Sequence, residues 1–276
     1  MNFHQKYLSI LNVIKDDIEI INKELITLIN INEPLKSKLT EFLSTPSKRI
    51  KPLLSILYLR SNNIELNQAH YKLLTAVELM HNASLIHDDI IDESKTRRSK
   101  KTLNFEFDSK LAVISGDYIL SKALQYLGTL NSPEIINIFA QTISQMCEGE
   151  TFQYFNKFEI PSIENYLKKT EQKTAKLFQS SLETSVLISN RELFSQASEL
   201  GKNFGIAFQI RDDLINIKTG KTDIFDGIYT APVIFSKNPS NPECGIEKTY
   251  CLLNNYVDRA FNCIQDIDDN KYKQAL

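Results

Sequence analysis

The stretch "YKLLTAVELMHNASLIHDDIIDESKTRR", residues 71–98, indicates both the fold class and a first candidate site. Its apolar residues recur at every third and fourth position, which is the pattern of an amphipathic helix. Aspartates interrupt the end of the apolar run, and two arginines follow shortly after. We therefore expect a long helix over residues 67–93 that ends in a cluster of carboxylates.

The same period continues over most of the chain. Gly and Pro are few, with eight of each, and no linker rich in Gly, Ser or Pro divides the sequence. The pattern predicts helices at residues 5–30, 35–44, 48–61, 67–93, 108–130, 132–157, 163–190, 193–218, 230–236, 243–257 and 258–268. We therefore expect an all-α, single-domain bundle of about ten or more helices over residues 1–276.

Composition narrows the possible functions. A net charge of −2 provides no global basic field for a nucleic acid. No signal-peptide pattern opens the chain and no zinc-site spacing is present, so we expect a cytoplasmic protein with reduced thiols at Cys147, Cys244, Cys251 and Cys263. No apolar run reaches the ~18–20 residues that span a bilayer, although a peripheral membrane contact is compatible with the composition.

Asp88, Asp89 and Asp92 form a D-D-x-x-D cluster at the end of the first helix. Four residues rotate a helix by about 400°, so Asp88 and Asp92 share one face. Like charges at this spacing repel, and the helix dipole at a C-terminus disfavours anions. Helix stability does not explain them, whereas magnesium prefers oxygen ligands and is often held by one or two carboxylates plus substrate phosphate.

A second acidic pair, Asp212 and Asp213 in "FQIRDDLINI", again lies deep in an apolar helix, with Asn216 four residues after Asp212. The two clusters predict magnesium ions that bind together with a diphosphate. The alternative is that each cluster is a solvated helix end. The tail segment "DIDD", residues 266–269, has that solvated character because its setting is polar and close to the end of the sequence.

Basic and polar groups accompany the acidic clusters and are candidates for binding phosphate. A basic group at a helix start adds its charge to free backbone N–H groups. His81 lies seven residues before Asp88, on nearly the same helical face. The candidates are Lys48, Arg49, Lys51, His81, Arg97, Arg98, Lys173, Thr174, Lys176 and Gln209. Singly each is typical of a solvated surface, and only their joint presence favours a site.

The order of the motifs "SKRIKPLL", "ELMHNASLIHDDIIDESKTRR", "SGDYILSKA", "EQKTAKLF" and "GIAFQIRDDLIN" resembles the trans-isoprenyl diphosphate synthases, or polyprenyl synthetases, from about residue 40 to 235. The resemblance implies the isoprenoid synthase fold, in which helices surround a deep central cavity, and a homodimer. It also implies magnesium-dependent, head-to-tail condensation of isopentenyl diphosphate with an allylic diphosphate.

The resemblance also implies roles for matching positions. The expected catalytic residues are Asp88, Asp89, Asp92, Lys173 and Asp212. Asp88, Asp92 and Asp212 would ligate Mg²⁺, about three ions per active site with substrate bound. The allylic diphosphate would contact Arg97, Lys173, Thr174 and Gln209. Isopentenyl diphosphate would contact Lys48, Lys51, His81 and Arg98.

Product length in this family depends on side chains beneath the first acidic cluster. Bulky aromatic residues there resemble synthases that stop at C15. Here the positions are Ala83 and Ser84, with Val77 and Met80 further along the helix. None is a large barrier, so we expect a product of about C30–C50, of the kind used for quinone side chains. A C20 product is the alternative, and the same small residues would also suit close helix packing.

Three positions depart from the family pattern. Asn216 and Lys51 stand where Asp and Arg are usual, and Ile228 stands where a loop lysine is usual, a role that Lys218 or Lys221 would have to take. These changes keep open a weakly active or non-catalytic subunit of a heteromeric synthase. A terpene cyclase on the same fold is less favoured because cyclases tend to lack the second aspartate pair. A purely structural helical protein has no need of two apolar helices that end in carboxylates.

Overall fold

The computed structural model describes residues 3–220 and 223–276 and contains almost only helices, as expected. The chain forms two compact units, residues 1–136 with 268–276 and residues 137–267. The elements of the first unit are α1 (Phe3–Val13), α2 (Lys15–Thr27), α3 (Leu35–Ser44), α4 (Ile50–Ser61), α5 (Gln68–Ile91), β1 (Thr96–Arg97), β2 (Lys100–Lys101), α6 (Leu103–Glu106), α7 (Ser109–Gly128) and α14 (Lys271–Ala275).

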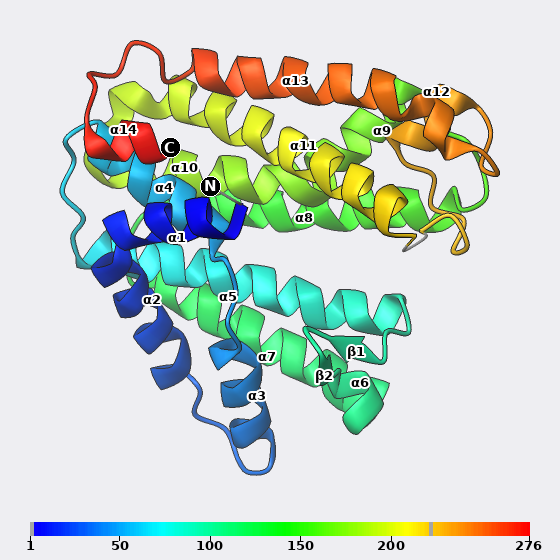
Figure 1. Cartoon of the computed structure of the whole chain (residues 1–276). Helices are drawn as coiled ribbons and strands as arrows, with labels where there is room; N and C mark the ends of the chain where they lie inside the picture. Colours follow the sequence, from blue (N-terminus) through cyan, green and yellow to red (C-terminus); the bar gives the residue numbers. More distant parts are fainter. Residues whose placement is uncertain (1–2, 221–222) are drawn as a thin grey trace. The chain divides into compact units, whose positions relative to one another are not determined.

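Helix α5 is the centre of the first unit and packs along α7, with α2 and α4 also against it (Figure 1). Asn67 caps its start, where the side-chain oxygen accepts from the backbone N–H groups of Ala69 and His70. The end of α5 approaches α7 so closely that a Cβ atom at Gly116 would lie 2.2 Å from the His87 ring. The packing therefore fixes the end of α5 that carries the first acidic cluster.

A buried carboxylate joins three helices of this unit. Arg60 on α4 donates from Nε and Nη2 to the two oxygens of Asp17 on α2, at 2.9 and 2.7 Å. The Tyr71 hydroxyl on α5 donates to the same carboxylate at 2.7 Å. Burial and this bond raise the pKa of Tyr71 to about 12. These bonds set the position of α5 relative to α2 and α4.

The second unit contains the rest of α8 (Pro133–Phe155), which begins in the first. Its other elements are α9 (Ile163–Thr170), the π-helical turn η1 (Glu171–Ala175), α10 (Lys176–Ser189), the 3₁₀ turn η2 (Arg191–Leu193), α11 (Phe194–Thr219), α12 (Ala231–Ser236), the 3₁₀ turn η3 (Pro242–Gly245) and α13 (Ile246–Asn262). Helix α11 packs against both α10 and α13 (Figure 1). A Cβ atom at Gly205 would lie 2.5 Å from the Ala175 Cα, so glycine lets α11 pack directly on η1.

The structure corrects several predicted boundaries. The helix expected at 5–30 is interrupted at Ile14, and the one expected at 163–190 contains the π-helical turn. The break expected between 257 and 258 is wrong, because α13 continues through both positions. The short β1–β2 hairpin and helices α6 and α14 were not predicted. None of the described helices combines the length and the apolar character that crossing a bilayer requires.

Candidate active site

The first acidic cluster lies where the sequence predicts it. Helix α5 ends at Ile91, and the Asp92 backbone N–H still donates to the Asp88 carbonyl at 2.8 Å. Helical geometry therefore continues to Asp92, and the carboxylates of Asp88 and Asp92 leave the same face one turn apart. Asp92 is exposed and Asp88 half-buried, so both are accessible to a ligand.

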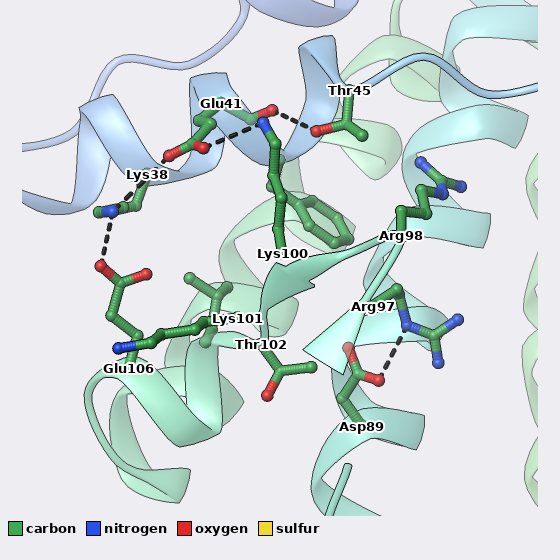
Figure 2. A pocket seen from close by; sticks show the side chains of 12 residues that line it. Lys38, Glu41, Thr45, Asp89, Arg97, Arg98, Lys100, Lys101, Thr102 and Glu106 are labelled. Atoms are coloured by element: carbon green, nitrogen blue, oxygen red, sulfur yellow. Dashed lines mark hydrogen bonds and ion pairs between the residues drawn. The ribbon is translucent and has the colours of Figure 1, made fainter. Parts of the chain in front are cut away.

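Asp89 points elsewhere. Its side chain is 3% exposed, and its Oδ1 accepts from Arg97 Nε at 2.8 Å (Figure 2). Its backbone carbonyl accepts from the Asn104 side chain at 3.0 Å. Burial raises the pKa of the Asp89 carboxyl, and the adjacent Arg97 charge opposes this rise. Asp89 therefore anchors Arg97, and its oxygen is directed away from the Asp88–Asp92 face.

Arg98 lies at the tip of a tight hairpin. The strands pair with Arg97 opposite Lys100, which leaves Arg98 and Ser99 as a two-residue loop. Both loop residues have positive φ, 51° and 63°, as a type I′ turn requires. Non-glycine residues adopt this conformation at a cost in free energy, so the turn places Arg98 in a strained position.

Ion pairs hold this hairpin and α6 to α3. Lys100 pairs with Glu41 at 3.0 Å, and Lys38 pairs with Glu106 at 2.5 Å (Figure 2). A cavity of ≈ 240 Å³ lies among these side chains, with Asp89, Arg97 and Arg98 also in its wall. All these groups are in the first unit.

Lys51 and Arg98, predicted to bind isopentenyl diphosphate together with His81, both act electrostatically on His81. The pKa of His81 lies well below its ordinary value, first because of desolvation and then because of the charges of Lys51 and Arg98, with further repulsion from Arg49 and Arg97. His81 is therefore neutral at pH 7 and stands among cations. Lys48, the fourth predicted group, is exposed just before the start of α4.

Arg49, which the sequence places in the basic cluster with Lys48 and Lys51, is held in a buried ion pair. Its side chain is buried and pairs with the buried Glu78 of α5 at 3.1 Å. Its remaining N–H groups donate to the Leu43 carbonyl at 2.7 Å and to the Asn22 side chain at 3.1 Å. Arg49 thus joins the start of α4 to α5, and sequence reasoning missed its partner.

The second unit brings the other predicted residues together. Lys173 and Thr174 lie on the π-helical turn η1, and Lys173 pairs with Glu150 of α8. The Thr174 hydroxyl donates to Gln209 Oε1 on α11 at 2.8 Å. Asp212, one turn of α11 further on, is partly exposed. Glu150 was not among the predicted site residues.

Asp213 is the buried member of the second acidic pair, at 2% exposure. It accepts from Gln209 Nε2 at 2.8 Å and from the Tyr166 hydroxyl at 2.6 Å. Burial raises its pKa to about 6, while Lys169 and the two hydrogen bonds oppose this rise. Sequence reasoning missed Tyr166 and Lys169, because the pattern of "IENYLKKT" indicates only a helix.

The donor chemistry fits magnesium. In the first unit, Asp88 and Asp92 present carboxylate oxygens from adjacent turns, and in the second unit Asp212 is partly exposed on α11. Among the described residues, no group of three or more His, Cys, Asp or Glu side chains is placed to hold a metal by itself. Magnesium, which is commonly held by one or two carboxylates plus substrate phosphate, suits the pair of Asp88 and Asp92 within the first unit.

The structure shows the burial or the hydrogen bonds of several residues that concern the departures from the family pattern. Asn216 is half-buried on α11, and the Ile228 N–H donates to the Asp223 carbonyl at 2.8 Å. Lys218 donates to the Tyr250 hydroxyl at 2.6 Å. Lys221 lies outside the described residues.

Comparison with known proteins identifies the family. A profile of the polyprenyl synthetases matches residues 32–271. The chain belongs to the polyprenyl synthetase family. It is therefore a prenyltransferase that elongates trans-prenyl diphosphates, and the family uses divalent metal ions with its diphosphate substrates.

Individual relatives agree with this assignment. The chain is 30% identical to a prenyl transferase of Synechocystis, over 92% of this chain and 80% of that protein. It is 32% identical to heptaprenyl diphosphate synthase component 2 of Bacillus subtilis, over 87% and 71%. The solved structure of heptaprenyl diphosphate synthase from Staphylococcus aureus matches with a TM-score of 0.87 and 27% identity, over 95% and 94%. These likenesses confirm the expected isoprenoid synthase fold.

The positions predicted to set product length lie on α5. Val77, Met80 and Ala83 are buried, at 0%, 3% and 2% exposure, and Ser84 is half-buried. The Ser84 hydroxyl donates to the His81 carbonyl at 2.8 Å. Ser84 is one turn before Asp88, so it shares the face of the acidic cluster. All four side chains are small or flexible, which leaves the predicted long product as a proposal.

Proposed function

We propose that this polyprenyl synthetase condenses isopentenyl diphosphate with an allylic diphosphate, such as farnesyl or geranylgeranyl diphosphate, to an all-trans polyprenyl diphosphate of about C30–C50 for quinone side chains. The observation that carries the proposal is the shared face of Asp88 and Asp92 at the end of α5, in the unit that also groups Lys51, His81 and Arg98.

Each group of residues has a separate task in the proposed reaction. Arg97, Lys173, Thr174 and Gln209 bind the allylic diphosphate, while Lys48, Lys51, His81 and Arg98 hold isopentenyl diphosphate. Holding both substrates converts a bimolecular encounter into a local reaction. Bound Mg²⁺, ligated by Asp88, Asp92 and Asp212, would neutralise charge on the departing diphosphate. Lys173 adds positive charge that stabilises the same leaving group.

The C30–C50 range is supported by residues and relatives together. Ala83 and Ser84 place no aromatic barrier before Asp88. A similar protein from Staphylococcus aureus is a heptaprenyl diphosphate synthase by name, and one from Bacillus subtilis is component 2 of such a synthase. Ala83→Phe, which adds a bulky ring at one of the positions predicted to set product length, should shorten the product by several isoprene units.

We also propose a homodimer. Helix α7 exposes Val113 and Leu124, at 43% and 47%, and these positions are eleven residues apart and share a face. Ile114, at 56%, widens this apolar surface. An exposed apolar face of this kind favours association with a second copy. Leu124→Glu should convert the dimer to a monomer in light scattering, and an unchanged mass would contradict a dimer through α7.

A second candidate function is a subunit of a heteromeric prenyl synthase. The Bacillus relative is a component by name, and Asn216 stands where the family pattern has an aspartate. A partner-dependent subunit would bind farnesyl diphosphate with Mg²⁺ yet form no product alone.

Turnover by the purified chain tests the proposed reaction. Farnesyl diphosphate and isopentenyl diphosphate should be consumed only with Mg²⁺ present. Asp88→Ala should lower kcat by about a thousandfold, since the loss of a metal ligand removes several kcal/mol of charge stabilisation. Consumption that is unaffected by Asp88→Ala would contradict the assigned site.

A further inference from the structure

Four side chains of the second unit form a continuous line of hydrogen bonds. The Tyr166 hydroxyl on α9 donates to Asp213 Oδ2 at 2.6 Å, and Gln209 Nε2 donates to Asp213 Oδ1 at 2.8 Å. The Thr174 hydroxyl on η1 then donates to Gln209 Oε1 at 2.8 Å. The line therefore connects α9 and α11 to the π-helical turn.

The far end of this line is rigid. Tyr166 is 1% exposed, and its ring packs in a core with Ala175, Ile206, Ile210 and Leu214, among others. A buried tyrosine places its ring in apolar surroundings and its hydroxyl on a polar partner. Burial and the Asp213 charge raise the pKa of Tyr166 well above its ordinary value, so the hydroxyl keeps its proton and remains a donor.

The donors and acceptors along the line permit one arrangement. Asp213, when ionised, only accepts, so its two oxygens take the Tyr166 hydroxyl and the Gln209 NH₂ group. The Gln209 amide is thereby oriented with its carbonyl toward Thr174. This orientation fixes the rotamer of Thr174, which is followed by Ala175 of the same core.

We propose that Tyr166 is a positioning residue of the allylic site, which through Asp213 and Gln209 sets the Thr174 hydroxyl that contacts the allylic diphosphate. This inference rests on the proposed function of Thr174. In this arrangement Gln209 orients Thr174 and is held by Asp213, and Tyr166 itself does not touch the substrate.

The test is a double-mutant cycle between the two ends of the line. Tyr166→Phe, Thr174→Val and the double variant are compared with the wild type for KM of farnesyl diphosphate, KM of isopentenyl diphosphate and kcat. Magnesium-dependent binding of farnesyl diphosphate is measured by calorimetry in the absence of isopentenyl diphosphate. Thr174→Ser, which keeps the hydroxyl, serves as the conservative variant.

Tyr166→Phe should raise KM and Kd for farnesyl diphosphate about tenfold, in line with the loss of a hydrogen bond to a charged group. KM for isopentenyl diphosphate should change less than about twofold, since those residues lie in the other group. Adding Thr174→Val to Tyr166→Phe should raise Kd by less than about a further twofold, because both changes remove the same positioning. In the Thr174→Ser background, Tyr166→Phe should keep its full effect.

A matched control is available in the first unit. Tyr71→Phe removes another tyrosine hydroxyl that donates to a buried aspartate, Asp17, at 2.7 Å. Tyr71 is seventeen residues before Asp88 on α5, about 25 Å along the helix. This variant should lower the free energy of unfolding without changing the KM of farnesyl diphosphate.

Three results would overturn the inference. The first is an unchanged Kd for farnesyl diphosphate in Tyr166→Phe. The second is a double variant in which the fold-changes in Kd of the two single variants multiply. The third is an equal loss of binding for farnesyl diphosphate and isopentenyl diphosphate. Failure of the proposed function appears differently, as a wild type that forms no product. Should Tyr166→Phe not fold, Asp213→Asn weakens the same line at the residue that holds Gln209, and the same non-additivity with Thr174→Val is required.

Discussion

Arg97 and Asp89 form a hydrogen-bonded ion pair in which Nε donates to Oδ1 at 2.8 Å. The pair joins the hairpin to the end of α5, and the aspartate is buried while the arginine is partly exposed. The three aspartates of the D-D-x-x-D cluster therefore have different roles. Asp88 and Asp92 leave one face of the helix and are proposed to ligate Mg²⁺, whereas Asp89 holds the arginine that is proposed to bind the allylic diphosphate.

Asp89→Asn tests this division. The amide keeps the shape but loses the charge that orients Arg97, so KM for farnesyl diphosphate should rise about tenfold, as expected for a weakened charged hydrogen bond. The loss should remain far smaller than that of Asp88→Ala. Steady-state kinetics of both variants check this, and equal losses would show that Asp89 is itself a metal ligand.

Breaking the buried ion pair of Arg49 and Glu78 by removing one partner should lower the free energy of unfolding much more than replacing both partners together. Glu78→Leu leaves a buried, uncompensated guanidinium and should lower the free energy of unfolding by about 3–5 kcal/mol. The double variant Arg49→Met with Glu78→Leu should recover most of that loss, because a well-packed apolar pair replaces the ion pair. Denaturant unfolding measures both, and additive losses would show that the two side chains act independently.

Ser99→Gly should stabilise the hairpin. Ser99 has a φ of 63°, a conformation that glycine adopts without steric cost. We expect a gain of up to about 1 kcal/mol, seen as a higher Tm, with Arg98 retained and turnover unchanged within about twofold. A lower Tm would mean that the Ser99 side chain makes a contact that outweighs the strain.

His81 should make stability fall in mild acid. Its folded pKa is depressed, so below the ordinary value near 6.5 the unfolded chain takes up a proton that the folded protein refuses. Its contribution is present above about pH 6.5 and is lost as pH falls toward the folded pKa, by up to about 1.4 kcal/mol per pH unit.

The variant His81→Gln separates the contribution of His81 to the pH dependence of stability from that of the titrating carboxylates. The free energy of unfolding of wild type and variant should converge as pH is lowered from 8 to 5, because only the wild type has the histidine penalty. A difference that stays constant over this range would show that His81 has an unperturbed pKa.

Local pattern predicted most of the fold. The expected helix at 35–44 coincides with α3, Leu35–Ser44, because its apolar residues follow the helical period without interruption. The break at Ile14 and the π-helical turn at Glu171–Ala175 were not predicted. Neither position has a Gly or Pro signal, and tertiary packing, such as that of Gly205 on Ala175, is not visible in a local window.

The site was predictable only where its residues are local in sequence. Asp88 and Asp92 share a face by helical geometry alone, whereas Glu78, which pairs with Arg49, and Tyr166, which donates to Asp213, come from distant segments. Glu78 was a visible signal, a single acid in an apolar run, but its partner is 29 residues away. Such pairing depends on how helices pack, which a single sequence does not specify.

Product length with the purified chain alone tests the central claim most directly. The wild type is incubated with Mg²⁺, labelled isopentenyl diphosphate in excess and farnesyl diphosphate, and products are separated by chromatography, with Asp88→Ala as the control. We predict a ladder that ends at one product of about C30–C50 and is absent from the control. A product that stops at C15 or C20, or no product from a folded protein that still binds farnesyl diphosphate with Mg²⁺, would contradict the proposal.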